Sequence, residues 1–110
     1  LQDIYTSGRA SEAETTATIA DALKTTGELL CPHSAVGVKV ANERREEAVP
    51  MITLATAHPA KFPDAVEAAT GVRPPLPPRM ADLFERKERL TRVANDLDAL
   101  KTHIKGALGA

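Results

Sequence analysis

One run of seven residues, 49–55, has the pattern of a strand in a buried sheet, and it limits the possible folds most. The run is mostly apolar, contains β-branched side chains and follows a charged stretch. Pro50 fits there, because the first residues of a strand tolerate proline. The other extended passage, residues 28–30, is short. Two strands cannot cover the faces and edges of a buried parallel sheet, so we expect the missing strands upstream in a longer chain.

Capping signals predict two helices before this run. Ser11 and Glu14 have the spacing of a capping box, which predicts a helix over residues 12–26, and the glycine that follows should end it. A second helix should begin at Pro32, since the first helical position needs no amide hydrogen. Gly37 lies inside this second helix. Glycine costs about 1 kcal/mol there relative to alanine, so we expect a close neighbour at Gly37.

Proline and capping residues also mark the second half of the chain. A third helix should cover residues 63–70, between a proline at its first position and a glycine after its end. Residues 72–78 contain four prolines and are predicted to form a meander. Asn95 is the predicted cap of a last helix, residues 95–108, whose apolar side chains form a stripe on one side.

The resulting order of helices and short strands is typical of an α/β fold with too few strands. We therefore predict that helices pack on a short, mostly parallel sheet, and that residues 1–110 form a single segment of a larger protein. Leu1 supports this expectation, because a natural start normally shows Met.

Composition excludes several classes of protein. The net charge is −1 and aromatic residues make up 3% of the chain, so no basic, aromatic-rich surface for nucleic acid is expected. The apolar runs are far shorter than the roughly 20 residues that cross a bilayer, which argues against a membrane partner. A single cysteine, Cys31, cannot form an internal disulfide, and this predicts a reducing, cytoplasmic location.

The best candidate site follows the strand-like run. At Thr56 the apolar side chains give way to small and polar ones, and His58 and Pro59 follow. In open α/β sheets, ligands bind beyond the carboxyl ends of the strands. This hydroxyl and this imidazole are therefore at a position that is typical of binding or catalytic residues. A threonine that merely caps a strand end is the alternative interpretation of Thr56.

Three blocks of sequence, in one order, resemble the C-terminal part of threonine synthase. They are Pro-His-Ser-Ala-Val-Gly at residues 32–37, Thr-Ala-His-Pro-Ala-Lys-Phe at residues 56–62 and Asn-Asp-Leu at residues 95–97. The resemblance extends over about residues 11–104. Threonine synthase is a pyridoxal 5'-phosphate (PLP) enzyme of fold type II, so the resemblance implies a C-terminal segment of a three-layer α/β enzyme.

The resemblance implies a cofactor contact and a reaction. Thr56 matches the threonine whose hydroxyl hydrogen-bonds the pyridine nitrogen of PLP, and a hydroxyl can donate to an unprotonated ring nitrogen. The full-length enzyme would convert O-phospho-L-homoserine and water to L-threonine and phosphate. Lys61 is not assigned as the Schiff-base lysine, which lies far upstream in this family. The isolated segment is therefore expected to lack catalytic residues and to be inactive without the rest of its polypeptide.

Other polar residues are candidates for the wall of this site. His33 and Ser34 stand near a helix N-terminus, where amide hydrogens favour an anion, and His58 could transfer protons, contact phosphate or bond nearby backbone. Cys31 stands where the family is expected to show Asp, so an acidic role there is in doubt. No metal site is predicted, because Cys31, His33 and His58 lack zinc spacing and a fourth ligand.

Two further functions remain open at this point. The chain could belong to another PLP enzyme of the same fold, such as a dehydratase, which would keep the cofactor contact and change the substrate. It could also be a small α/β binding module without catalysis.

Overall fold

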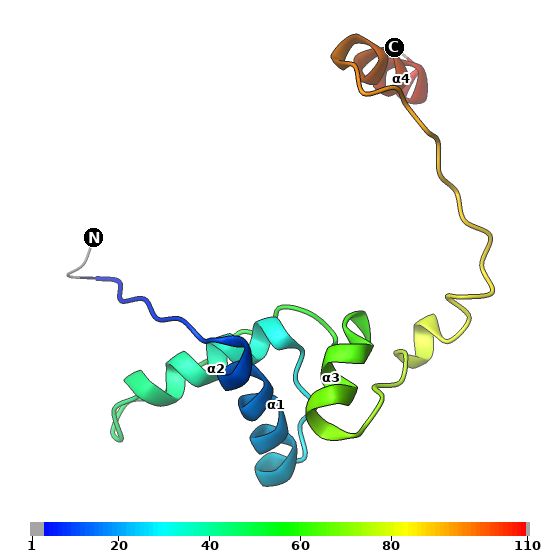
Figure 1. Cartoon of the computed structure of the whole chain (residues 1–110). Helices are drawn as coiled ribbons and strands as arrows, with labels where there is room; N and C mark the ends of the chain where they lie inside the picture. The colour runs from blue at the N-terminus through cyan, green and yellow to red at the C-terminus, as the bar shows by residue number, and fades with distance from the viewer. Residues whose placement is uncertain (1–3, 110) are drawn as a thin grey trace. The chain divides into compact units, whose positions relative to one another are not determined.

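The computed structural model describes residues 4–109 and divides the chain after Met80 into two compact units (Figure 1). The first unit contains α1 (Glu12–Thr26), α2 (Pro32–Arg44), the 3₁₀ turn η1 (Pro59–Lys61), α3 (Pro63–Thr70) and a second 3₁₀ turn, η2 (Pro78–Met80). The second unit contains α4 (Leu97–Leu108). All residues of the candidate site lie in the first unit.

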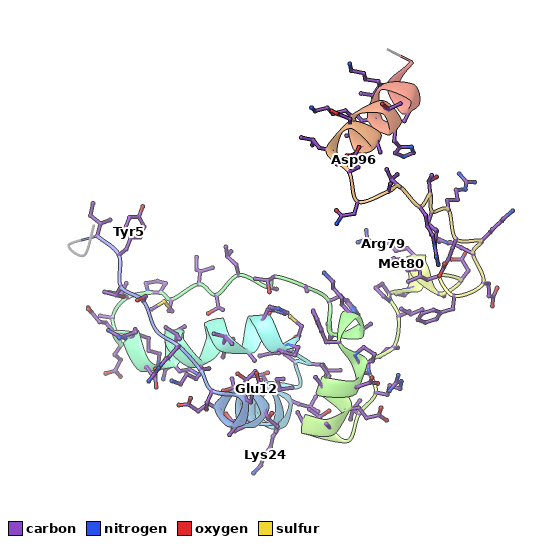
Figure 2. All side chains as sticks on the ribbon, turned by 45° about the horizontal axis from the view of Figure 1, so that its top comes forward. Tyr5, Glu12, Lys24, Arg79, Met80 and Asp96 are labelled. Carbon is purple, nitrogen blue, oxygen red and sulfur yellow. The ribbon has the colours of Figure 1, made fainter. Side chains whose placement is uncertain are left out.

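Helix α1 has the predicted bounds, and its ends explain why. The Glu14 amide donates to Ser11 Oγ at 3.3 Å, and Glu14 Oε2 accepts from the Ser11 amide at 2.7 Å. Gly27 ends the helix in the left-handed region, with φ of 77°. Glu12 in the first turn and Lys24 in the last turn have the charges that the helix dipole favours (Figure 2). Local interactions therefore account for this helix.

Helix α1 lies against both α2 and α3 (Figure 1), and the core lies among these three helices. Each helix contributes one fully buried apolar side chain, namely Ile19, Ala35 and Val66. Leu29 and Leu30 pack against these three from the connection between α1 and α2. The core is small, and it holds the first turn of α2 in place.

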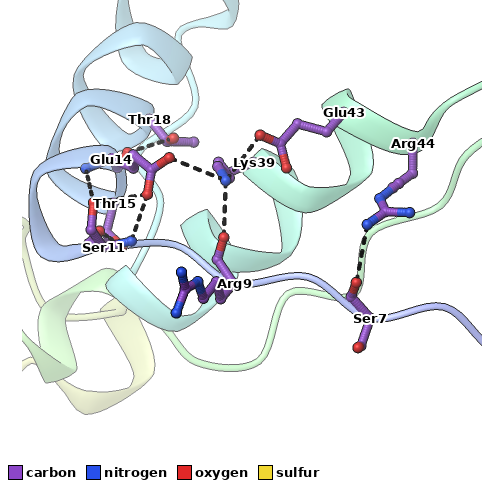
Figure 3. Close-up of polar contacts among 9 residues, drawn as sticks. All are labelled: Ser7, Arg9, Ser11, Glu14, Thr15, Thr18, Lys39, Glu43 and Arg44. Atoms are coloured by element: carbon purple, nitrogen blue, oxygen red, sulfur yellow. Dashed lines mark hydrogen bonds and ion pairs between the residues drawn. The ribbon is translucent and has the colours of Figure 1, made fainter.

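A polar cluster ties the start of the chain to α2 (Figure 3). Lys39 Nζ lies 3.2 Å from Glu14 of α1 and 2.9 Å from Glu43. The same ammonium group donates to the Arg9 carbonyl at 2.9 Å, and Arg44 donates to the Ser7 carbonyl at 3.2 Å. These bonds hold the connector before α1 along the side of α2.

The predicted strands are absent from the part of the chain that the structure describes, which contains no β-strand. Residues 50–55 run without regular structure, and residues 28–30 do the same. A strand needs a neighbour for its backbone donors and acceptors, and residues 4–109 offer none. Ile52 and Leu54 are consequently 82% and 77% exposed. The prediction that helices pack on a short, mostly parallel sheet is not met within these residues.

The segment that was predicted as a strand nevertheless has a definite position along α2 (Figure 1). A Cβ added at Gly37 would lie 3.0 Å from Cγ2 of Thr53. The predicted close neighbour at Gly37 is thus confirmed, and glycine there lets the extended segment approach the helix.

The third and the last helix are present, and one of their caps differs from the prediction. Helix α3 has the predicted bounds, and Gly71 ends it with φ of 73°. No helix or strand is assigned over residues 71–77, and Pro74 within them is buried. The last helix is α4, and its cap is Asp96, whose carboxylate accepts from the Ala99 amide at 2.8 Å. The prediction of Asn95 as this cap was wrong by one residue, because the carboxylate at the next position bonds the helix amide.

The apolar stripe predicted on α4 is present and exposed. Leu97, Leu100, Ile104 and Leu108 are all at least 45% exposed. Within residues 4–109, no helix is both long and apolar enough to cross a membrane.

Candidate functional site

Ser34 and Thr56, 22 residues apart in sequence, meet at the start of α2. The Thr56 amide donates to Ser34 Oγ at 3.1 Å, and the two hydroxyl oxygens lie 3.5 Å apart. Cys31 Sγ completes the cluster at 3.2 Å from Ser34 Oγ and 3.9 Å from Thr56 Oγ1. Ser34 and Cys31 are buried, whereas Thr56 is exposed. The cluster therefore joins an exposed threonine to two buried polar side chains.

Thr56 lines two hollows in the surface of the first unit. The larger has a volume of about 620 Å³ and is bounded by the connection before α2, the end of the extended segment and the prolines after α3. The smaller, of about 270 Å³, is also lined by His33, Lys61 and Phe62. The polar or proline residues that line the larger hollow with Thr56 include Glu28, Cys31, Ser34, His58, Pro59, Pro74 and Pro75.

Cys31 caps α2 in place of the expected aspartate. Its Sγ accepts from the Ser34 amide at 3.4 Å, as an N-cap side chain does. Burial raises the pKa of the Cys31 thiol, but hydrogen bonds from Ser34, Thr56 and the His33 backbone outweigh that effect, so the pKa is lowered. The side chain is only 1% exposed, which limits access of reagents to the sulfur.

His58 bonds nearby backbone, which confirms one of the interpretations of this residue. Its Nδ1 accepts from the Ala60 amide at 3.1 Å and caps the 3₁₀ turn η1. Because η1 leads directly into α3, this bond shapes the turn between the extended segment and that helix. The imidazole is exposed and lines the larger hollow beside Thr56.

His33 faces the smaller hollow beside an aromatic ring. Its centroid lies 4.7 Å from that of Phe62, with the rings inclined by 48°. Lys61 Nζ lies 5.8 Å from the Phe62 centroid, within the range of a cation–π interaction. In the described part of the chain, no three His, Cys, Asp or Glu side chains are grouped to hold a metal ion.

The residues predicted from the sequence lie around the same two hollows, but their contacts were not predicted. Ser34, His33 and His58 line the same hollows as Thr56. The bond from the Thr56 amide to Ser34 had no sequence signal, because a serine at the third position of a helix is common. Pro74 and Pro75 were also missed, since the meander was not expected to reach the site. Only the path of residues 71–75 places them there.

The chain matches known proteins over nearly its whole length. The family model described as "Threonine synthase, C-terminal" matches residues 34–104. Threonine synthase from Pseudomonas aeruginosa is 48% identical over 103 residues, which are 92% of this chain and 22% of that protein. Threonine synthase from Corynebacterium glutamicum is 39% identical over 105 residues, or 94% of this chain and 22% of that protein.

A solved structure gives the same result in three dimensions. The X-ray crystal structure of PLP-bound threonine synthase from Brucella melitensis is 50% identical and superimposes with a TM-score of 0.84. The match covers 94% of this chain and 22% of that one, so the chain spans about a fifth of the length of these relatives. Since the family model also covers well over half of the chain, this chain belongs to the family of threonine synthase C-terminal regions.

Proposed function

We propose that the chain forms the C-terminal part of a PLP-dependent threonine synthase. The observation that carries this proposal is the identity of 48% to 50% with threonine synthases, one of them bound to PLP, over more than nine tenths of the chain. The complete enzyme would convert O-phospho-L-homoserine and water to L-threonine and phosphate. These matches favour a threonine synthase over a dehydratase or a non-catalytic module.

We assign Thr56 to the pyridine nitrogen of the cofactor. Thr56 is exposed and lies in the wall of a hollow of about 620 Å³, and the neighbouring Ser34 carries an uncharged hydroxyl group. A neutral hydroxyl suits an unprotonated ring nitrogen, to which it donates its hydrogen, whereas a carboxylate would require a protonated ring. PLP, when bound, supplies an electron sink for proton removal from the substrate, and Thr56 orients the ring that does so.

We further propose roles for the wall residues and for the rest of the polypeptide. His33, Ser34 and His58 line the same two hollows and would form one side of the cofactor site. The lysine that holds PLP covalently, and the groups that bind the substrate phosphate, would come from the remaining sequence. This chain would then supply support and orientation and no catalytic base.

The extended segment would join a sheet formed by that remaining sequence. Its exposed Ile52 and Leu54, and the absence of a partner strand within residues 4–109, support this proposal. The helices of the first unit would then cover one side of the sheet, as expected for PLP fold type II. Such an arrangement would also fix the end of the segment at Thr56.

The test is phosphate release from O-phospho-L-homoserine by the full-length enzyme under saturating PLP. Wild type should release phosphate and should not deaminate serine or threonine at a comparable rate. Thr56→Val should reduce activity and PLP affinity while the fold survives, because one neutral hydrogen bond contributes about 0.5–1.5 kcal/mol.

Thr25→Val is the matched control, since Thr25 lies on α1 and its hydroxyl donates to the Asp21 carbonyl, outside the site. It should leave PLP affinity and activity unchanged. A folded wild-type enzyme that neither binds PLP nor releases phosphate would refute the proposed function. Rapid deamination of serine without phosphate release would favour the dehydratase.

A further inference from the structure

We propose that Ser34 is a positioning residue, which holds Thr56 so that its hydroxyl donates toward the ring nitrogen of the cofactor. This inference rests on the proposed function, because it assumes the contact between Thr56 and PLP. It assigns to Ser34 a task that differs from lining the wall of the site.

The first argument is the rigidity of the support. Ser34 is 3% exposed and lies in the first turn of α2, directly before Ala35, which is 0% exposed and part of the core. Thr56 lies at the end of an extended segment that has no partner strand among residues 4–109. The bond of 3.1 Å from the Thr56 amide to Ser34 Oγ therefore ties Thr56, at the end of that segment, to a well-packed residue.

The second argument is the direction in which the hydroxyl hydrogens of Ser34 and Thr56 are donated. Ser34 Oγ accepts from the Thr56 amide and has one hydrogen of its own to donate. When Ser34 donates it to Thr56 Oγ1, 3.5 Å away, the Thr56 oxygen becomes an acceptor toward the protein. The Thr56 hydrogen is then available to Cys31 Sγ, 3.9 Å away, or to an acceptor in the hollow. An unprotonated pyridine nitrogen is such an acceptor.

Cys31 adds polar contacts to this arrangement on its buried side. Its sulfur lies 3.2 Å from Ser34 Oγ and accepts from the Ser34 amide at 3.4 Å. The thiol hydrogen can point to Ser34 Oγ or to Thr56 Oγ1, which lies 3.9 Å away. When the thiol donates to Thr56 Oγ1, it occupies that oxygen as an acceptor on the protein side and leaves the Thr56 hydrogen for an acceptor in the hollow.

A double-mutant cycle separates positioning from a merely structural role. Ser34→Ala, Thr56→Val and the double variant would be made in the full-length enzyme. PLP affinity would be measured by titrating the apoenzyme, and the absorption spectrum of the bound cofactor recorded. Thr56→Val retains the backbone amide that Ser34 binds, so a structural effect of Ser34 persists in that background while an effect through the hydroxyl disappears.

Ser34→Ala should weaken PLP binding about threefold to tenfold and shift the cofactor spectrum, as expected for one lost hydrogen bond. In the Thr56→Val background, the same change should alter PLP affinity by less than about twofold. Thr15→Val is the control, because Thr15 is also buried and its hydroxyl donates to the Ser11 carbonyl at 2.8 Å in α1. It should leave affinity and spectrum unchanged.

An equal loss of affinity in both backgrounds would overturn the inference, because Ser34 would then act on the fold alone. Unchanged affinity and spectrum in Ser34→Ala, with weakened binding in Thr56→Val, would overturn it and leave the proposed function standing. Unchanged binding in a folded Thr56→Val would refute the assigned contact itself. If Ser34→Ala does not fold, Ser34→Cys replaces it, because cysteine has a similar volume and forms weaker hydrogen bonds. Ser34→Cys should bind PLP with an affinity between those of wild type and Thr56→Val. Unchanged PLP affinity in Ser34→Cys would also overturn the inference.

Discussion

Lys39 Nζ lies 3.2 Å from Glu14 Oε1 and thereby links the first turn of α1 to the middle of α2. The Glu14 carboxylate also closes the capping box at Ser11, so one side chain stabilises a helix end and a helix pair. The Lys39 side chain is 17% exposed and also contacts Glu43. Capping and packing of α1 are therefore coupled through Glu14.

This coupling predicts a stability that depends on pH. The Ser11 amide, the Ser11 hydroxyl and Lys39, in that order, lower the pKa of Glu14 from 4.5 to about 2. A carboxyl whose pKa is lower in the folded state stabilises the fold above its unfolded pKa and ceases to do so as the pH falls through the folded pKa. The urea concentration at the midpoint of unfolding should therefore decrease as the pH is lowered from 4.5 to about 2. The decrease should be smaller in Glu14→Gln.

Lys39→Met is a useful companion to that experiment. It removes the ammonium group and retains an apolar stem, so the pKa of Glu14 should rise above about 2 but remain below 4.5, since Ser11 still donates two hydrogen bonds. NMR titration of the Glu14 carboxyl measures this directly. A return to 4.5 would show that Lys39, and not the capping box, dominates.

The small core predicts a large effect for one substitution. Ile19 is 2% exposed and packs with Ala35 and Val66, so Ile19→Ala should lower the free energy of unfolding by about 2–5 kcal/mol. Ile19→Val should cost only about 0.5–1.5 kcal/mol. The exposed neighbour on α1 provides the control, because Thr16→Ala should change stability by less than about 0.5 kcal/mol. Equal effects of Ile19→Ala and Thr16→Ala in urea unfolding would contradict the packing described above.

The close approach at Gly37 predicts a coupling between two substitutions. Alanine is a better helix former than glycine by about 1 kcal/mol, but a Cβ at position 37 would lie 3.0 Å from Cγ2 of Thr53. Thr53→Ser removes that methyl group. Gly37→Ala should therefore be more favourable in the Thr53→Ser background than in wild type, as measured by urea unfolding. Identical effects in both backgrounds would mean that the extended segment does not lie against α2.

The sequence by itself determined the elements whose ends depend on near neighbours in the chain. The capping box at Ser11, the glycines after α1 and α3, and the prolines that begin α2 and α3 act over three or four residues, and each of these ends was predicted correctly. The cap of α4 was misplaced because two adjacent residues, Asn95 and Asp96, both suit that role.

Only the tertiary structure decided what depends on distant partners. Residues 50–55 have the composition of a strand, but a strand forms only where another strand supplies backbone partners, and residues 4–109 supply none. The motif around Thr56 indicated a site, whereas its contact with Ser34 arises from the path of the segment along α2. Bonds between neighbouring residues can be inferred from spacing, but a bond that closes a loop of 22 residues depends on how the helices pack.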